Sequence, residues 1–171
     1  GWLSPQNRLH GTGFAYALEH GYEAILTLDS DGQHDPEEIP KFVTALAEAH
    51  ADIVLGHRVV DTERMPVLRR LTNQLMSRLV SAVAGQKIPD SQCGFRAIRR
   101  EVLASVQLTA TRFDLETELL LAACRRGWRI TSVPIRAIYR RQASHIQPVL
   151  DGFRFLRLLL RYSGRSPTPP P

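Results

Sequence analysis

A short apolar run that ends at two acidic residues constrains the fold of this chain more than any other feature. Residues 24–28 (Ala-Ile-Leu-Thr-Leu) are followed directly by Asp29-Ser30-Asp31-Gly32. A brief apolar run with an abrupt polar end is typical of a buried strand in a parallel sheet. Ligands of such sheets bind beyond the carboxyl ends of the strands, so Asp29 and Asp31 stand where a site is expected.

The residues after this loop predict a helix and then a second strand. Asp35-Pro36-Glu37-Glu38 is a helix start, because Asp35 can cap, Pro36 suits the first helical position and Glu38 suits a capping box. The apolar face of the helix is expected to carry Ile39, Phe42, Val43 and Leu46. Residues 53–55 form the next short strand. Strand, helix and strand in this order predict an α/β fold with a right-handed crossover.

The rest of the chain predicts further helices and one more strand. Helices are expected over residues 12–20, 67–84, 114–126 and 149–162, and a strand over residues 128–135 with Pro134 at a sheet edge or strand end. The helix over 67–84 is the clearest amphipathic segment, with its apolar face formed by Leu68, Leu71, Leu75, Leu79 and Val83. We expect one domain over residues 1–162 and a disordered, Pro-rich tail over residues 163–171.

Charge is divided unevenly along the 171 residues. Residues 1–60 contain three Lys/Arg and nine Asp/Glu, whereas residues 61–171 contain 19 Lys/Arg and eight Asp/Glu. An acidic half indicates metal binding, and a basic half indicates phosphates, nucleic acid or an anionic membrane surface. The last predicted helix carries Arg154, Arg157 and Arg161 beside leucines, which suits an anionic membrane surface or a packed helix with a solvated face.

Further sequence features concern the cellular environment of the protein and the start of the chain. The two cysteines, Cys93 and Cys124, show neither metal spacing nor a disulfide framework, which predicts small buried residues in a reducing, cytoplasmic environment. No apolar run is long enough for a transmembrane helix, and no signal peptide is visible. The chain begins with Gly1 rather than Met, which indicates a fragment or a processed product.

The Asp29-x-Asp31 pair is a candidate metal site. Mg²⁺ and Mn²⁺ prefer oxygen ligands and commonly bridge to substrate phosphates, and Gly32 allows a tight turn beside a ligand. A polar turn after a strand remains the alternative. Two other uses of the pattern fail: a dehalogenase-like phosphatase needs a late acidic motif that is missing, and an EF-hand needs its glycine at the sixth position.

Several segments, taken in order, resemble the family 2 glycosyltransferases, in the branch of the dolichyl- and polyprenyl-phosphate mannosyl- and glucosyltransferases. The matching segments are Gly21-Tyr22-Glu23-Ala24, Leu28 to Pro36, Val54-Leu55-Gly56-His57-Arg58, Asp90 to Arg96, Phe113 to Glu118, and Ser144-His145-Ile146 followed by Pro148 and Asp151. The resemblance covers roughly residues 11–160. It implies a GT-A fold, a Rossmann-like mixed sheet flanked by helices. The family's opening strands, which shape the nucleotide-base pocket, have no counterpart here, and its Gly-Lys-Gly segment is reduced to Leu9-His10-Gly11.

The resemblance also implies roles for individual residues. Asp29, Asp31, Asp90 and Glu116 are the expected catalytic residues. Asp29 and Asp31 are expected to ligate Mg²⁺ or Mn²⁺, Asp90 to lie in a loop under the sugar, and Glu116 to serve as the base if a hydroxyl is the acceptor. Residues expected to bind substrate, mainly through phosphate groups, are Gln33, Arg58, Arg69, Gly94, Phe95, Arg140, Arg141 and His145. Which of Arg140 and Arg141 meets the diphosphate stays open, and a turn or a solvated surface is the alternative for several of these positions.

The function implied is transfer of a hexose from a nucleoside-diphosphate sugar to a polyprenyl phosphate. The expected partners are the sugar donor, the lipid-phosphate acceptor and an anionic membrane surface, with the protein in the cytoplasm on the inner face of a membrane. The alternative is an incomplete glycosyltransferase fragment that acts at most as a binding module. A nucleic-acid binder is disfavoured, because the first part is acidic and the basic part lacks interleaved aromatic residues.

Overall fold

The computed structural model describes residues 13–48, 50–59, 67–108, 114–136 and 148–164. Residues 13–19 are helical, and Gly21 follows them with a φ of 74°. The elements that follow are β1 (Ala24–Thr27), the 3-10 helix η1 (Pro36–Glu38), α2 (Ile39–Glu48), β2 (Ile53–Val59), α3 (Val67–Ala84), β3 (Arg96–Arg99), α4 (Arg100–Ser105), α5 (Asp114–Arg125), β4 (Ile130–Arg136) and α6 (Pro148–Ser163).

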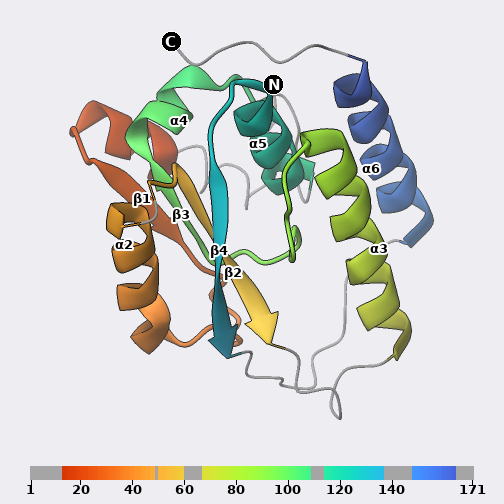
Figure 1. Ribbon diagram of the computed structural model, residues 1–171, viewed down its shortest axis with the longest axis horizontal. Coiled ribbons are helices and arrows are strands. Elements are labelled where there is room, and N and C mark those ends of the chain that lie inside the picture. The colour runs from red at the N-terminus through yellow and green to blue at the C-terminus, as the bar shows by residue number, and fades with distance from the viewer. Residues whose placement is uncertain (1–12, 49, 60–66, 109–113, 137–147, 165–171) are drawn as a thin grey trace.

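The described strands form a mixed sheet in the order β1-β3-β2-β4. Strand β3 runs antiparallel to both β1 and β2, whereas β2 and β4 are parallel and point to the same end of the molecule (Figure 1). The predicted mixed α/β sheet is confirmed. Pro134 lies in β4, an outer strand of this order, where its missing N–H breaks no ladder.

Helices cover both faces of the sheet, α2 on one side and α3, α5 and α6 on the other (Figure 1). The alternation of side chains along β2 explains the two layers. Ile53 and Leu55 are fully buried with residues of α3, α5 and α6, whereas Val54 is fully buried with residues of α2. A strand covered on both faces is apolar throughout, which is why residues 53–55 were recognisable as a strand.

The start of α2 follows the sequence prediction for Asp35 and Pro36, but Glu38 pairs with Lys41 instead of closing a capping box, and one apolar position differs. The Asp35 carboxylate accepts a hydrogen bond from the Glu37 N–H at 3.0 Å, and Pro36 begins η1. Phe42 and Leu46 are buried, as predicted. The prediction for Val43 is wrong, because its side chain is 59% exposed.

The bounds of α3 match the prediction, and Val83 of the predicted apolar face packs against the core, but the prediction is wrong for three leucines of that face. Leu71, Leu75 and Leu79 are 54%, 58% and 41% exposed. The buried face is built instead on Ser77 and Val80. Two apolar stripes run along this helix. A hydrogen bond between α3 and the segment before β3 explains why the buried stripe contains a serine.

That hydrogen bond joins α3 to the segment before β3. The Ser91 N–H donates to the Ser77 hydroxyl at 3.0 Å, and the two hydroxyl oxygens lie 3.2 Å apart. A buried serine that satisfies a buried backbone N–H is favourable, whereas a leucine there would leave that donor unpaired. Hydrophobic periodicity could not reveal this preference. Among the described helices, none is long and apolar enough to cross a membrane.

Candidate active site

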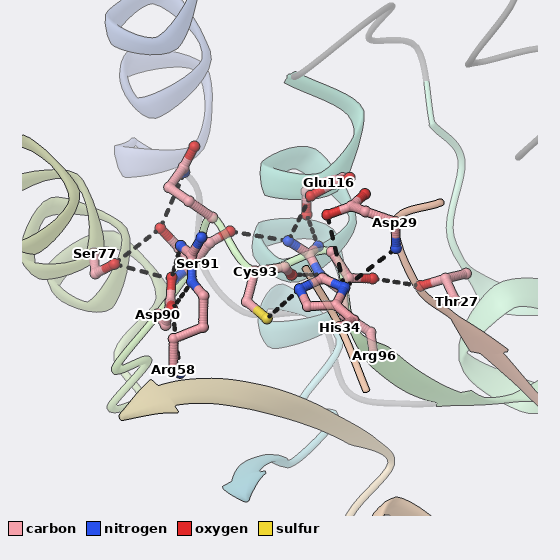
Figure 2. A network of polar contacts seen from close by, with 12 residues as sticks. Thr27, Asp29, His34, Arg58, Ser77, Asp90, Ser91, Cys93, Arg96 and Glu116 are labelled. Carbon is pink, nitrogen blue, oxygen red and sulfur yellow. Dashed lines mark hydrogen bonds and ion pairs between the residues drawn. The ribbon is translucent and has the colours of Figure 1, made fainter. Parts of the chain in front are cut away.

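The loop that leaves β1 carries the first part of the candidate site (Figure 2). Thr27, the last residue of β1, donates its hydroxyl to the Gly94 carbonyl at 3.0 Å, which joins this loop to the segment before β3. Asp29 follows two residues later, and half of its side chain is exposed. A carboxylate at a strand exit that still reaches solvent can bind a ligand from solution.

Local hydrogen bonds give the acidic loop a fixed conformation. The Gln33 N–H donates to Asp31 Oδ1 at 2.9 Å, an Asx-turn, and Gly32 between them has a φ of 74°. That backbone conformation favours glycine over any residue with a side chain. The turn leaves Asp31 partly exposed, and Gln33, a predicted substrate contact, is also partly exposed.

Gly94 lies directly against the carboxylate of Asp29. A Cβ atom built on Gly94 would be 2.5 Å from Asp29 Oδ2, 2.6 Å from Oδ1 and 2.7 Å from Cγ. These separations are too short for any real side chain. Glycine is therefore required here so that the Asp29 carboxylate can occupy its present position.

His34 supports the same loop from beneath (Figure 2). The Asp29 N–H donates to His34 Nδ1 at 3.2 Å, which makes Nδ1 an acceptor and leaves the ring proton on Nε2. Nε2 faces Cys93 Sγ at 3.8 Å. Burial lowers the pKa of His34, with the nearby Asp29 charge opposing that effect. His34 is therefore neutral, and its 3.9 Å approach to Asp29 Oδ2 is not a salt bridge.

Replacing His34 separates a positioning role from simple packing. His34→Asn places Oδ1 where Nδ1 lies and keeps the acceptor for the Asp29 N–H, whereas His34→Gln extends its acceptor beyond that point. We expect His34→Gln to weaken Mn²⁺ binding about 10-fold and His34→Asn to weaken it much less. Calorimetric titration with Mn²⁺ measures both, with Cys93→Ala as the control. Equal affinities for the two His34 variants would contradict the role.

The environment of Asp29 opposes its negative charge. Burial raises its pKa, and the charges of Glu116 and Asp31 raise it further, with His34 and Arg96 acting in the opposite sense. A cation bound at Asp29 would relieve this unfavourable environment.

These residues fit a hard divalent cation that is shared with a ligand. Among the residues that the structure describes, no three His, Cys, Asp or Glu side chains converge as a closed metal cage. Two carboxylates with open positions are the arrangement by which Mg²⁺ or Mn²⁺ binds substrate phosphates. Asp29 and Asp31 would supply the protein ligands of such an ion.

Arg58 and Asp90 form a buried ion pair on the other side of the site (Figure 2). Arg58 Nε donates to Asp90 Oδ2 at 2.7 Å and a terminal nitrogen donates to Oδ1 at 2.9 Å, and both side chains are about nine-tenths buried. This fork joins the end of β2 to the segment before β3. That Arg58 binds an acceptor phosphate, and that Asp90 is catalytic, stay predictions.

Arg96 holds the remaining carboxylate, that of Glu116 near the start of α5. The guanidinium is 2% exposed and donates to Glu116 Oε2 at 2.9 Å and to the Glu116 carbonyl at 2.8 Å. It also donates to the carbonyls of Cys93 at 2.7 Å and Ser91 at 2.9 Å. One buried cation thus fixes both the loop that carries Gly94 and the candidate base.

Glu116 keeps access to open space despite this pairing. Its side chain is 31% exposed. It borders a small pocket that is also lined by Phe14 and Leu115. This pocket is largely apolar and has a volume of only about 10 Å³, so it is too small for a sugar or an acceptor, and the role of Glu116 as a base stays a prediction.

Phe95 lies in the core rather than facing the site. Its side chain is fully buried, with ring centroids 4.2 Å from Phe42 and 5.3 Å from His34. Burial raises the pKa of Cys93 to about 11 and that of Cys124 to about 12, so both are inert thiols, as predicted.

Some predicted contacts cannot be placed. Arg140, Arg141 and His145 lie outside the described residues, as does the side chain of Arg69. Two supporting residues, His34 and Arg96, were not among the predicted site residues. Both lie inside the motifs that pointed to their neighbours, but their roles depend on side-chain contacts that the sequence pattern does not specify.

A mixed sheet between helical layers, with a carboxylate pair at one strand exit, defines this chain as a GT-A-type glycosyltransferase domain. The chain belongs to glycosyl transferase family 2, whose model matches residues 4–106. This confirms the resemblance drawn from the sequence motifs.

Relatives agree with the predicted branch. The chain is 32% identical over 161 residues to the UDP-N-acetylglucosamine–dolichyl-phosphate N-acetylglucosaminyltransferase of Methanococcus voltae, covering 90% of this chain and 64% of that protein. It is 31% identical over 134 residues to the undecaprenyl-phosphate mannosyltransferase of Micrococcus luteus, covering 75% of this chain and 54% of that protein. The chain thus spans less than two thirds of the length of these curated relatives.

A solved structure shows the same fold. Glucosyl-3-phosphoglycerate synthase of Mycobacterium tuberculosis matches with a TM-score of 0.64 and 20% identity, over 83% of this chain and 50% of that one. A further structure of that enzyme contains Mn²⁺, UDP-glucose and phosphoglyceric acid, and matches with a TM-score of 0.60 and 18% identity.

Proposed function

We propose that this chain binds a nucleoside-diphosphate sugar through a divalent cation and transfers the hexose to a polyprenyl phosphate. The observation that carries the proposal is the Asp29 carboxylate, which lies against Gly94 at the end of β1 beside Asp31. The family supports glycosyl transfer as the reaction, and the names of the curated relatives support a lipid-phosphate acceptor.

The roles of the residues follow from their positions. Asp29 and Asp31 would hold Mg²⁺ or Mn²⁺, which neutralises the charge that develops on the departing nucleoside diphosphate. Attack on the far side of the sugar carbon inverts its configuration. A phosphate acceptor is already an anionic nucleophile, so Glu116 acts as a base only if the acceptor is a hydroxyl.

The remaining parts of the proposal concern phosphate binding and location. Gln33, Arg58, Arg69, Arg140, Arg141 and His145 are proposed to contact phosphate groups of donor or acceptor, with Asp90, Gly94 and Phe95 shaping the loop under the sugar. We place the protein in the cytoplasm, peripheral on the inner face of a membrane, because a polyprenyl phosphate resides there.

A transfer assay tests the proposal directly. The chain is incubated with UDP-glucose or GDP-mannose and polyprenyl phosphate, with Mn²⁺ or with EDTA, and the lipid product is separated by chromatography. We expect a glycolipid with Mn²⁺ and background levels with EDTA. Transfer that is equally fast in EDTA would contradict the metal site.

A second candidate function is a donor-binding module without turnover. Calorimetry separates the two candidates. Mn²⁺-dependent heat on adding the nucleotide sugar, together with no lipid product, supports the binding module. No such heat with any donor contradicts both.

A further inference from the structure

Helix α3 presents an apolar stripe to solvent. Leu71, Leu75 and Leu79 follow one another at steps of four residues, and all are exposed. Their face lies nearly opposite the buried Ser77 and Val80, so it is not covered by the described part of the fold. Contiguous exposed leucines of this kind mark an interaction surface.

Helix α6 presents a second stripe of the same kind. Phe153, Leu156 and Leu160 are 70%, 51% and 68% exposed. Arg154, Arg157 and Arg161 lie along the adjacent side of the helix, and all are exposed, although Arg161 also pairs with the buried Glu118 at 3.4 Å. The opposite face of α6 is buried against the core.

The two helices are neighbours in the fold. They pack against each other at one side of the sheet, away from α2 (Figure 1). The first residues of α3 lie at the end of the molecule toward which β2 and β4 point. Asp29 also lies at this end, because β1 runs in the same direction as β2. One end of this surface and the candidate active site therefore lie at the same end of the molecule.

The charge of these two helices indicates which partner binds their exposed stripes. The sequence of α3 contains arginines but no acidic residue, and that of α6 has a single Asp among three arginines. A second copy of the chain would place arginines against arginines. An anionic lipid surface instead offers phosphates to the guanidinium groups and an apolar layer to the leucines and the phenylalanine.

We infer that the exposed stripes of α3 and α6 bind the surface of an anionic lipid bilayer, with Leu71, Leu75, Leu79, Phe153, Leu156 and Leu160 entering the headgroup region. The use of this surface to reach a lipid acceptor rests on the proposed function, whereas the binding itself requires no turnover. Neither helix crosses the bilayer in this arrangement, since both keep one face on the protein core.

Vesicle co-sedimentation tests the inference with the full chain. We expect binding to vesicles of equimolar phosphatidylcholine and phosphatidylglycerol, weaker binding to phosphatidylcholine alone, and a decrease with salt. Leu75→Ser combined with Leu79→Ser should weaken binding at least about 10-fold, and Arg157→Gln about fivefold. Val43→Ser is the matched control, because Val43 is equally exposed but lies on α2.

Three results would overturn the inference. These are no binding to the anionic vesicles, equal binding by the Leu75/Leu79 double variant and the wild type, and a dimer in gel filtration that this variant dissociates. Mn²⁺-dependent heat with UDP-glucose or GDP-mannose, measured on the same proteins, keeps the two proposals apart. Vesicle binding without that heat defeats only the proposed function, and heat without vesicle binding defeats only this inference.

Discussion

Replacing Gly94 with alanine is expected to weaken Mn²⁺ binding about 100-fold, with little loss of stability. The new Cβ would lie within 2.7 Å of three atoms of the Asp29 side-chain carboxylate, which has to move away. A carboxylate is the end of a flexible, half-exposed side chain, so it can rotate toward solvent at a cost below about 1 kcal/mol. The metal then loses one of its two proposed ligands. Calorimetry with Mn²⁺ and thermal unfolding measure the two effects.

Two further variants make this prediction specific. Asp29→Ala should reproduce the loss of Mn²⁺ affinity, and Gly94→Ala combined with Asp29→Ala should add little to it. Gly56→Ala is the control for a glycine whose replacement affects stability instead. Its Cβ would meet Ile135 Cδ1 at 2.7 Å and Cys93 Sγ at 3.0 Å inside the core. We expect Gly56→Ala to lower the stability by about 1–3 kcal/mol. Normal Mn²⁺ affinity in Gly94→Ala would contradict the assignment of Asp29.

Replacing Arg96 with methionine is expected to destabilise the protein by about 3–5 kcal/mol. The substitution removes a buried cation and leaves the carbonyls of Ser91, Cys93 and Glu116 without their donor. Buried acceptors that lose their partner carry a full desolvation penalty. Urea denaturation, followed by circular dichroism, measures the change in the free energy of unfolding.

Arg96→Lys distinguishes the charge of this residue from its geometry. Lysine keeps the positive charge beside Glu116 but cannot donate to four acceptors in the planar arrangement that the guanidinium provides. We expect a loss between the wild type and Arg96→Met. A change below about 1 kcal/mol for Arg96→Met would show that the segment before β3 is held by other contacts.

The elements with strong local signals could be predicted from the sequence. The apolar runs of β1 and β2, the capped start of α2 and the bounds of α3 all follow from periodicity and caps. The prediction that β1 is a buried strand of a parallel sheet was wrong, because β1 is only partly buried and pairs antiparallel with β3. Strand β3 and helix α4 were missed, because Arg96 and Arg99 leave only two apolar residues in that strand. Its strand conformation comes from pairing with β1 and β2, which no local pattern records.

The face of a helix was harder to predict than its existence. Two apolar stripes compete on α3, and the one that contains Ser77 is buried because Ser91 requires an acceptor there. The leucine stripe, the stronger signal in sequence, faces outward. The hydrophobic periodicity thus predicted the helix correctly but indicated the wrong face as the buried one.

The candidate site also contains some residues that could be predicted from the sequence and others that could not. Its acidic residues were predictable, since Asp29 and Asp31 follow a recognisable strand. Their supports were not, because they depend on side-chain contacts, some of them distant in sequence, that no local pattern records. Arg96 reaches across 20 residues to Glu116, and Cys93 lies 59 residues from His34.

The antiparallel pairing of β1 and β3 has a consequence for the newly made chain. Thr27 and Gly94 meet although 67 residues separate them. While a ribosome is still producing the intervening residues, the acidic loop has been synthesised but the glycine that accommodates its first carboxylate has not. The proposed cation site therefore requires that β3 has joined the sheet, so metal binding at this site would follow completion of the described sheet.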